Sequence, residues 1–106
     1  MMDQYEVIIE PSAEDDLREI YNYIANNLQS NVNAVNQLER IRKEISELET
    51  MPESFHLYPK EPWYSRGLHY CPVGNYEIFY MVDKAVHKVN VLRVLYGKIN
   101  FLEIWK

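Results

Sequence analysis

The chain has 106 residues, which suffice for one hydrophobic core but not for two, so we expect a single domain over residues 1–106. The lone cysteine, Cys71, excludes an internal disulfide and a four-cysteine metal site, and we interpret it as a small packed hydrophobe. No signal-peptide pattern opens the chain, and no apolar run approaches the about 18 residues of a membrane span. We therefore expect a cytoplasmic protein without a membrane partner.

The net charge of −5 is unevenly distributed along the chain. Residues 1–51 hold 11 acidic and 4 basic side chains, a balance of −7, whereas residues 52–106 hold 5 acidic and 7 basic ones, a balance of +2. The first half would repel a polyanion, so any nucleic-acid role would be confined to the second half. The alternative is that the acidic residues merely solvate exposed helix faces.

The first half of the chain predicts a strand followed by two helices. Alternating apolar residues over 5–10 indicate a short strand, which ends at Pro11. Apolar residues then recur at helical spacing over 13–28, and again over 32–51, where Pro52 disfavours continuation. The polar, asparagine-rich joint between them predicts an antiparallel hairpin. Its apolar stripes either pack on a sheet or remain partly open for a partner.

Residues 52–64 are expected to form a loop because three of the five prolines lie there. The loop is also aromatic, with Phe55, His56, Tyr58, Trp63 and Tyr64. Such side chains either pack onto a sheet edge or stack on a base or another ring.

The second half predicts three strands, at 68–73, 76–82 and 86–96, with turns at 73–75 and 83–85. Strict alternation in the last strand places four residues on one face: Val89, Val91, Arg93 and Leu95. The whole pattern predicts an α+β fold. It comprises an N-terminal strand, a two-helix antiparallel hairpin and a three-stranded antiparallel meander, with the helices covering one antiparallel sheet.

The sequence offers no metal or cofactor motif, because the three histidines are scattered and the three glycines do not form a phosphate loop. Polar residues with the chemistry to bind a phosphodiester and move protons do occur in the second half: Lys60, Arg66, His69, Tyr70, Tyr76, Arg93, Tyr96 and Lys98. The alternative is a half-exposed sheet decorated with cross-strand polar pairs. We expect no cofactor and no small-molecule substrate.

Four segments together resemble the RelE/ParE superfamily of bacterial toxins from type II toxin–antitoxin modules. They are YEVIIEPSAEDDLREIYNYI (5–24), ISELETMP (45–52), GLHYCPVGNYEIFYMVD (67–83) and VNVLRVLYGK (89–98). The resemblance covers nearly the whole chain. It implies a small cytoplasmic protein that inhibits growth, serves plasmid stabilisation or addiction, and is held inactive by a cognate antitoxin.

The superfamily divides into a branch that cleaves mRNA in the translating ribosome and a branch that binds a target such as DNA gyrase. Nuclease members commonly carry arginine where this chain has Glu77, His69 and Ile99. A carboxylate beside the scissile phosphate is repelled unless it serves as a base. The resemblance therefore favours the binding branch.

The alternatives are a ribosome-dependent mRNA endoribonuclease and a degenerate, non-toxic antitoxin-binding protein. If the chain is an enzyme, the catalytic residues implied by the resemblance are Arg66, His69, Glu77, Arg93 and Lys98, with Glu77 or His69 as base. Apolar residues that could meet the antitoxin are Leu28, Val32, Phe101, Ile104 and Trp105.

Overall fold

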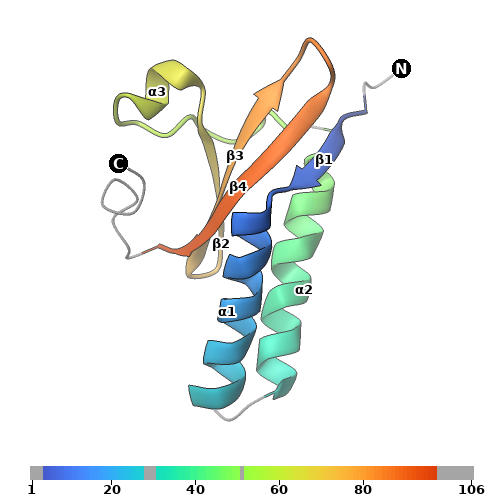
Figure 1. The fold of residues 1–106 in the computed structure, drawn as a ribbon, viewed down its shortest axis with the longest axis vertical. Helices are drawn as coiled ribbons and strands as arrows, with labels where there is room; N and C mark the ends of the chain where they lie inside the picture. Colours follow the sequence, from blue (N-terminus) through green and yellow to red (C-terminus); the bar gives the residue numbers. More distant parts are fainter. Residues whose placement is uncertain (1–3, 28–30, 51, 98–106) are drawn as a thin grey trace.

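The computed structural model describes residues 4–27, 31–50 and 52–97. The elements in chain order are β1 (Glu6–Ile9), α1 (Pro11–Asn27), α2 (Asn31–Glu47), α3 (Trp63–Arg66), β2 (His69–Val73), β3 (Tyr76–Asp83) and β4 (Lys88–Tyr96). The predicted α+β fold is confirmed. Figure 1 shows α1 and α2 side by side against the sheet, and their lower ends extend beyond it. No helix in the described ranges is long and apolar enough to cross a membrane.

The four strands form one sheet in the order β1-β4-β3-β2. The antiparallel meander of β2, β3 and β4 is as predicted. The sheet is not antiparallel throughout, however, because β1 runs parallel to β4, with Glu6 opposite Lys88 and Ile9 opposite Val91. Parallel neighbours need a long connection, which the helices and the meander supply. The sequence of a four-residue strand does not indicate its direction, so the parallel pairing of β1 with β4 becomes visible only in the structure.

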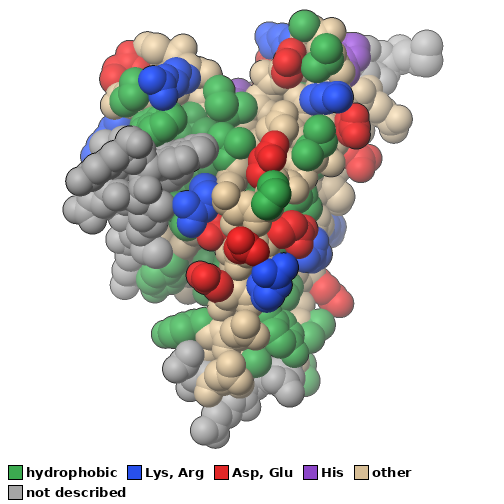
Figure 2. Space-filling view, in the orientation of Figure 1, with side chains coloured by type: hydrophobic (Ala, Val, Ile, Leu, Met, Phe, Trp, Pro, Cys, Tyr) green, Lys and Arg blue, Asp and Glu red, His purple; other side chains and the backbone are tan. Residues whose placement is uncertain are grey.

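Helix α1 begins at Pro11, a position where the missing N–H of proline is not needed. In the first turn the N–H groups of Ala13 and Glu14 both donate to the Glu10 carbonyl, at 2.9 and 3.0 Å. Among the exposed acids of this helix, Asp15 accepts from Arg18 at 2.8 Å. Figure 2 shows acidic side chains over the α1 region with basic ones between them, which agrees with acids that solvate an exposed helix face.

Helix α2 ends at Glu47, whereas the sequence predicts that it continues to Met51. The N–H groups of Leu48, Glu49 and Thr50 each donate to the carbonyl three residues earlier, so the chain tightens after the helix instead of continuing it. Pro52 follows shortly, and the residue before a proline is disfavoured in the helical conformation. Met51 itself lies outside the described residues.

The helices bury their apolar stripes against the face of the sheet that we call the inner face. The helical members of this core are Ala13, Leu17, Ile20, Ile24, Ile41, Ile45 and Leu48. The strand members are Cys71, Val73, Ile78, Tyr80, Val89, Val91 and Val94. Each large apolar side chain buried in this way contributes about 1.5–3 kcal/mol. Packing on the sheet is therefore the main role of the two helical stripes in this fold.

A β-bulge in β4 overturns the predicted alternation of that strand. Phe79 lies opposite Arg93 and Tyr80 lies opposite Val91, so Leu92 is an extra residue without a partner in β3. An extra residue shifts the alternation from that point onward. Val94 therefore joins Val89 and Val91 in the inner core, whereas Leu95 lies on the opposite face.

The other face of the sheet, which we call the outer face, has a smaller apolar cluster. Its buried members are Leu68, Phe79 and Leu95, with Tyr58, Trp63, Tyr70, Met81 and Leu92 partly buried around them. Tyr58 and Trp63 come from the predicted loop, and the short helix α3, which the sequence did not predict, begins near the end of that loop. Their packing on the sheet is the first of the two alternatives stated for the aromatic loop.

Candidate functional site

Arg93 is bound to helix α1 at the point where β1 no longer covers the edge of β4. Its Nε and Nη2 atoms donate to the Asp16 carboxylate at 2.7 and 2.9 Å. The same carboxylate accepts the backbone N–H of Val94 at 2.9 Å, so it satisfies the strand edge beyond Val91, the last residue of β4 that pairs with β1. The hydrogen bonds that Arg93 donates to Asp16 raise the pKa of the Arg93 guanidinium. Arg93 is thus a fixed structural cation.

His69, in β2, faces the inner side of the sheet. It lies opposite Tyr80, and the two rings are stacked with centroids 5.2 Å apart. Its Nδ1 atom is 2.9 Å from the Phe55 carbonyl, which fixes the ring against the loop before β2. The hydroxyl of Tyr80 donates to the Pro52 carbonyl at 2.6 Å, so this part of the inner face is tied to the start of the same loop.

Arg66 ends helix α3 and is exposed. Its guanidinium carbon lies 5.2 Å from the centroid of the Trp63 ring, a cation–π contact within one helical turn. The Glu61 carboxylate accepts the Ser65 N–H at 2.7 Å and also the Ser65 hydroxyl, and these bonds lower the pKa of Glu61. Helix α3 lies before β2, so Arg66 is at the far end of that strand from the β2–β3 turn (Figure 1).

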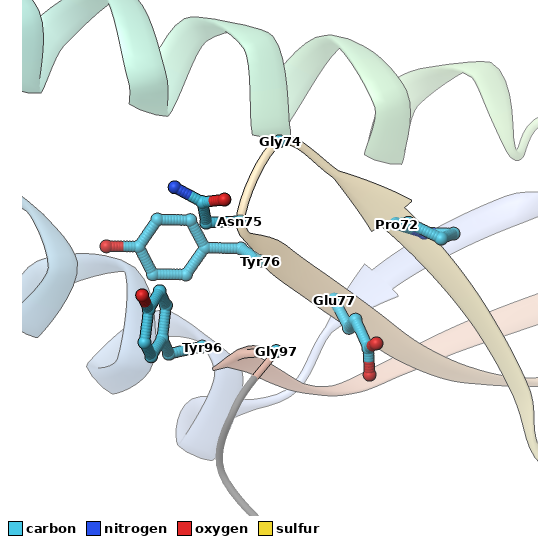
Figure 3. A pocket seen from close by; sticks show the side chains of 7 residues that line it. All are labelled: Pro72, Gly74, Asn75, Tyr76, Glu77, Tyr96 and Gly97. Atoms are coloured by element: carbon cyan, nitrogen blue, oxygen red, sulfur yellow. The ribbon is translucent and has the colours of Figure 1, made fainter.

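Glu77 lines a pocket of about 210 Å³ beside the β2–β3 turn. The lining residues are Pro72, Gly74, Asn75, Tyr76, Glu77, Tyr96 and Gly97. Figure 3 shows the rings of Tyr76 and Tyr96 on one side of the hairpin and the Glu77 carboxylate on the other. The two rings pack edge to face, with centroids 5.7 Å apart. The Gly97 N–H donates to the Asn75 carbonyl at 2.7 Å and fixes the end of β4 to the turn.

Burial raises the pKa of Glu77, because a partly dehydrated carboxylate is less stable when ionised. The same environment acts on two neighbouring tyrosines. Burial and the nearby Glu77 raise the pKa of Tyr58, and burial with the nearby Tyr23 raises the pKa of Tyr76. The pocket therefore combines the Glu77 carboxylate with the phenol of Tyr76, whose raised pKa favours its neutral form.

The structure describes four of the five predicted site residues, and it does not bring these four together. His69 faces the inner side, Glu77 lies on the outer side near the turn, and Arg93 is bound to α1. Arg66 lies at the other end of β2. The fifth, Lys98, lies outside the described residues. Within the described ranges, none of the predicted cations lines the pocket.

Three residues of structural or site importance were not among the predicted site residues: Asp16, Pro72 and Gly97. A signal for Asp16 was present, since it lies three residues after Ala13 and four before Ile20 on the apolar stripe of α1. An acid on such a stripe indicates a buried partner. Pro72 and Gly97 gave no comparable signal, because only the strand pairing brings them beside Glu77.

The described residues hold no group of three or more histidine, cysteine or acidic side chains that could bind a metal. Cys71 is fully buried on the inner face, and this burial raises the pKa of its thiol to about 12. A thiol that stays protonated at neutral pH is a poor nucleophile. The structure thus agrees with the interpretation of Cys71 as a packed hydrophobe.

Three solved structures with a similar fold come from toxin–antitoxin systems. One is the chromosomal ParDE system from P. aeruginosa, with a TM-score of 0.73 and 16% identity over 90% of this chain and 98% of that one. The RelBE2 toxin–antitoxin complex from Mycobacterium tuberculosis has a TM-score of 0.60 and 19% identity, over 88% of this chain and 98% of that one. The archaeal RelE–RelB complex from Pyrococcus horikoshii has a TM-score of 0.62 and 15% identity, over 92% of this chain and 99% of that one. At these identities the likeness shows the fold alone.

The family model for the ParE toxin of the type II toxin–antitoxin system parDE matches residues 7–101. Because this match covers most of the chain, the protein belongs to the ParE toxin family. It is the toxin component of a type II toxin–antitoxin module. A search of curated proteins gives no significant match.

Proposed function

We propose that the protein inhibits growth by binding a cellular target, DNA gyrase, and that it does not cleave RNA. The observation that carries this proposal is the carboxylate of Glu77 in the pocket beside the β2–β3 turn. A scissile phosphate at that place would face a like charge at close range. Arg93, the described cation best placed within the sheet, already neutralises Asp16 and is not available to balance a phosphate.

The protein works, in this proposal, as a small module with two alternative partners in the bacterial cytoplasm. One partner is the gyrase, whose inhibition stops growth. The other is the cognate antitoxin, which binds the toxin and keeps it inactive. Loss of a labile antitoxin would then release the toxin, which is how such a pair can stabilise a plasmid.

Inducible expression in a bacterium, with and without the antitoxin, tests the first step. We expect growth arrest from the toxin alone and recovery when the antitoxin is co-expressed. A well-folded product that leaves growth unchanged would overturn the proposal and favour a degenerate antitoxin-binding protein.

Purified gyrase then tests the target. We expect the protein to inhibit supercoiling of relaxed plasmid and to trap cleaved gyrase–DNA complexes, while primer extension finds intact transcripts in arrested cells. Cleavage within translated codons, with gyrase unaffected, would instead identify a ribosome-dependent endoribonuclease.

The double variant His69→Ala/Arg93→Ala separates the two mechanisms only if a control variant accounts for its loss of stability. Removing Arg93 leaves Asp16 unpaired, so lost toxicity could reflect an unstable fold. Asp16→Asn is the matched control, because it disrupts the same ion pair while it keeps the guanidinium. In the binding mechanism, toxicity should follow the folded fraction in both variants. In a nuclease, the variant that lacks Arg93 should lose far more activity than its stability explains.

A further inference from the structure

Glu77 is a partly buried carboxylate that has no partner among the described residues. It lies on the outer face between Pro72 on β2 and Leu95 on β4, both of which are its neighbours across the strands. Among the residues that the structure describes, Glu77 forms no ion pair and no side-chain hydrogen bond. Two other acids with restricted exposure do have partners: Asp16 binds Arg93, and Glu10 accepts from Asn90 at 2.6 Å. Dehydration without a partner is unfavourable for an ionised group.

The pocket beside this carboxylate is kept open by Gly97. A Cβ atom at position 97 would lie 3.7 Å from Oε1 of Glu77 and 3.2 Å from the Asn75 carbonyl oxygen. The described glycines with a positive φ are Gly67 and Gly74, so the backbone conformation at Gly97 does not itself require glycine. What the glycine provides is space next to the carboxylate.

We propose that the pocket receives the cationic side chain of an arginine or lysine from the antitoxin, with Glu77 as its acceptor. The inference rests on the proposed neutralisation of this toxin by an antitoxin. Charge complementarity selects the occupant, because an unpaired carboxylate is satisfied by a cation and repels a phosphate. Two carboxylate oxygens can accept both N–H groups of a guanidinium fork.

The walls of the pocket suit the remainder of such a side chain. Pro72 lies beside Glu77 on the neighbouring strand, and Tyr58, Tyr70 and Leu95 continue the apolar surface of the outer face. The methylene stem of an arginine or lysine packs on surfaces of this kind while its charged end reaches a polar partner. The antitoxin segment should therefore carry its cation next to apolar residues that continue along the outer face.

Calorimetric titration of the toxin with its antitoxin tests the proposal. Glu77→Gln should weaken binding about tenfold, because it removes the acceptor charge from a partly dehydrated pair. The control Glu39→Gln removes the same charge from an exposed position on α2 and should change affinity less than about twofold. Gly97→Ala keeps the carboxylate but fills the space beside it, and it should weaken binding as well. Thermal melting of each variant confirms that it is folded.

A double-mutant cycle identifies the cation. Each arginine and lysine of the antitoxin is replaced in turn by glutamine and titrated against wild-type toxin and against Glu77→Gln. One of these substitutions should weaken binding to the wild type about tenfold and have little further effect on the variant. Additive losses for every antitoxin cation would overturn the proposal.

The outcomes separate this inference from the function on which it rests. If the wild-type chain neither arrests growth nor binds the antitoxin, the proposed function fails. If the wild type binds the antitoxin and Glu77→Gln binds within about twofold, the function stands and the cation pocket is wrong. If Glu77→Gln instead abolishes self-association of the toxin in sedimentation, the occupant is a second copy of this chain and the proposal is overturned.

Discussion

The inner and outer faces of the sheet are covered by different parts of the chain. Two long helices cover the inner face, and Tyr80 and Ile78 on that face are completely buried. The outer face is covered, within the described residues, by a short loop and α3, and it ends at a pocket with an unpaired carboxylate. The inner face therefore supplies most of the stability, and the outer face has the features of a surface that binds another molecule.

Replacing one aliphatic residue on each face gives the largest contrast. Ile78→Ala leaves a cavity in the inner core and should lower the free energy of unfolding by about 3–4 kcal/mol. Leu92→Ala removes a partly buried side chain at the bulge and should lower it by about 1 kcal/mol. Urea denaturation measures both values. Equal losses would mean that the outer face is packed as tightly as the inner one.

The next contrast concerns two consecutive acids on α1. Asp16→Ala removes a carboxylate that binds both Arg93 and the Val94 N–H, and it should lower the free energy of unfolding by about 3 kcal/mol. Asp15→Ala removes an ion pair at the surface, where the Asp15 side chain is 67% exposed and that of Arg18 is 68% exposed. This variant should change the free energy of unfolding by less than about 0.5 kcal/mol. Similar effects of the two variants would show that the Asp16 network does not hold the helix to β4.

The fold could be predicted because its signals are local and repeated. The apolar periodicity of both helices and the turn at Gly74 each identify an element from neighbouring residues alone. The bulge at Leu92 could not be predicted from β4 alone. An extra residue is recognised only when the residues of β4 are paired with those of β3. The parallel pairing of β1 has the same cause, since strand direction depends on the whole topology.

The candidate site was less predictable than the fold, since residue type does not reveal which face a side chain occupies. His69 and Glu77 were grouped by chemistry, yet strand pairing places His69 with Tyr80 on the inner face and Glu77 with Leu95 on the outer one. Arg93 was grouped with them although α1 holds it. Glu77 stood out in the sequence as a departure from the nuclease branch, and in the structure it lines the pocket.

Two tyrosines offer a smaller contrast between the faces. The buried hydroxyl of Tyr80 donates to the Pro52 carbonyl, so Tyr80→Phe should lower the free energy of unfolding by about 1–2 kcal/mol through the unsatisfied carbonyl. Tyr70→Phe, on the partly exposed outer face, should change it by less than about 0.5 kcal/mol. Thermal melting of the two variants side by side checks this. A larger effect of Tyr70→Phe would reveal a hydroxyl contact on the outer face that stabilises the fold.

The smallest expected effect is the dependence of stability on the ionisation of Glu77. Because burial raises its pKa above the usual 4.5, the native chain keeps this proton to a higher pH than the unfolded chain does. Stability therefore falls as the pH rises through the window between the two values, and the loss is complete above it. Glu77→Gln should be more stable than wild type at pH 7, by less than about 1 kcal/mol since solvent screens a partly exposed group.

The advantage of Glu77→Gln should vanish below about pH 4, where the carboxyl is protonated in both states. Thermal melting at pH 7 and pH 4 measures it, with Glu39→Gln as the charge-matched control. A variant less stable than wild type at pH 7 would mean that Glu77 is already paired within the free chain. If the cation pocket is real, the same variant binds the antitoxin more weakly, because the carboxylate that destabilises the free toxin is the group that holds the complex together.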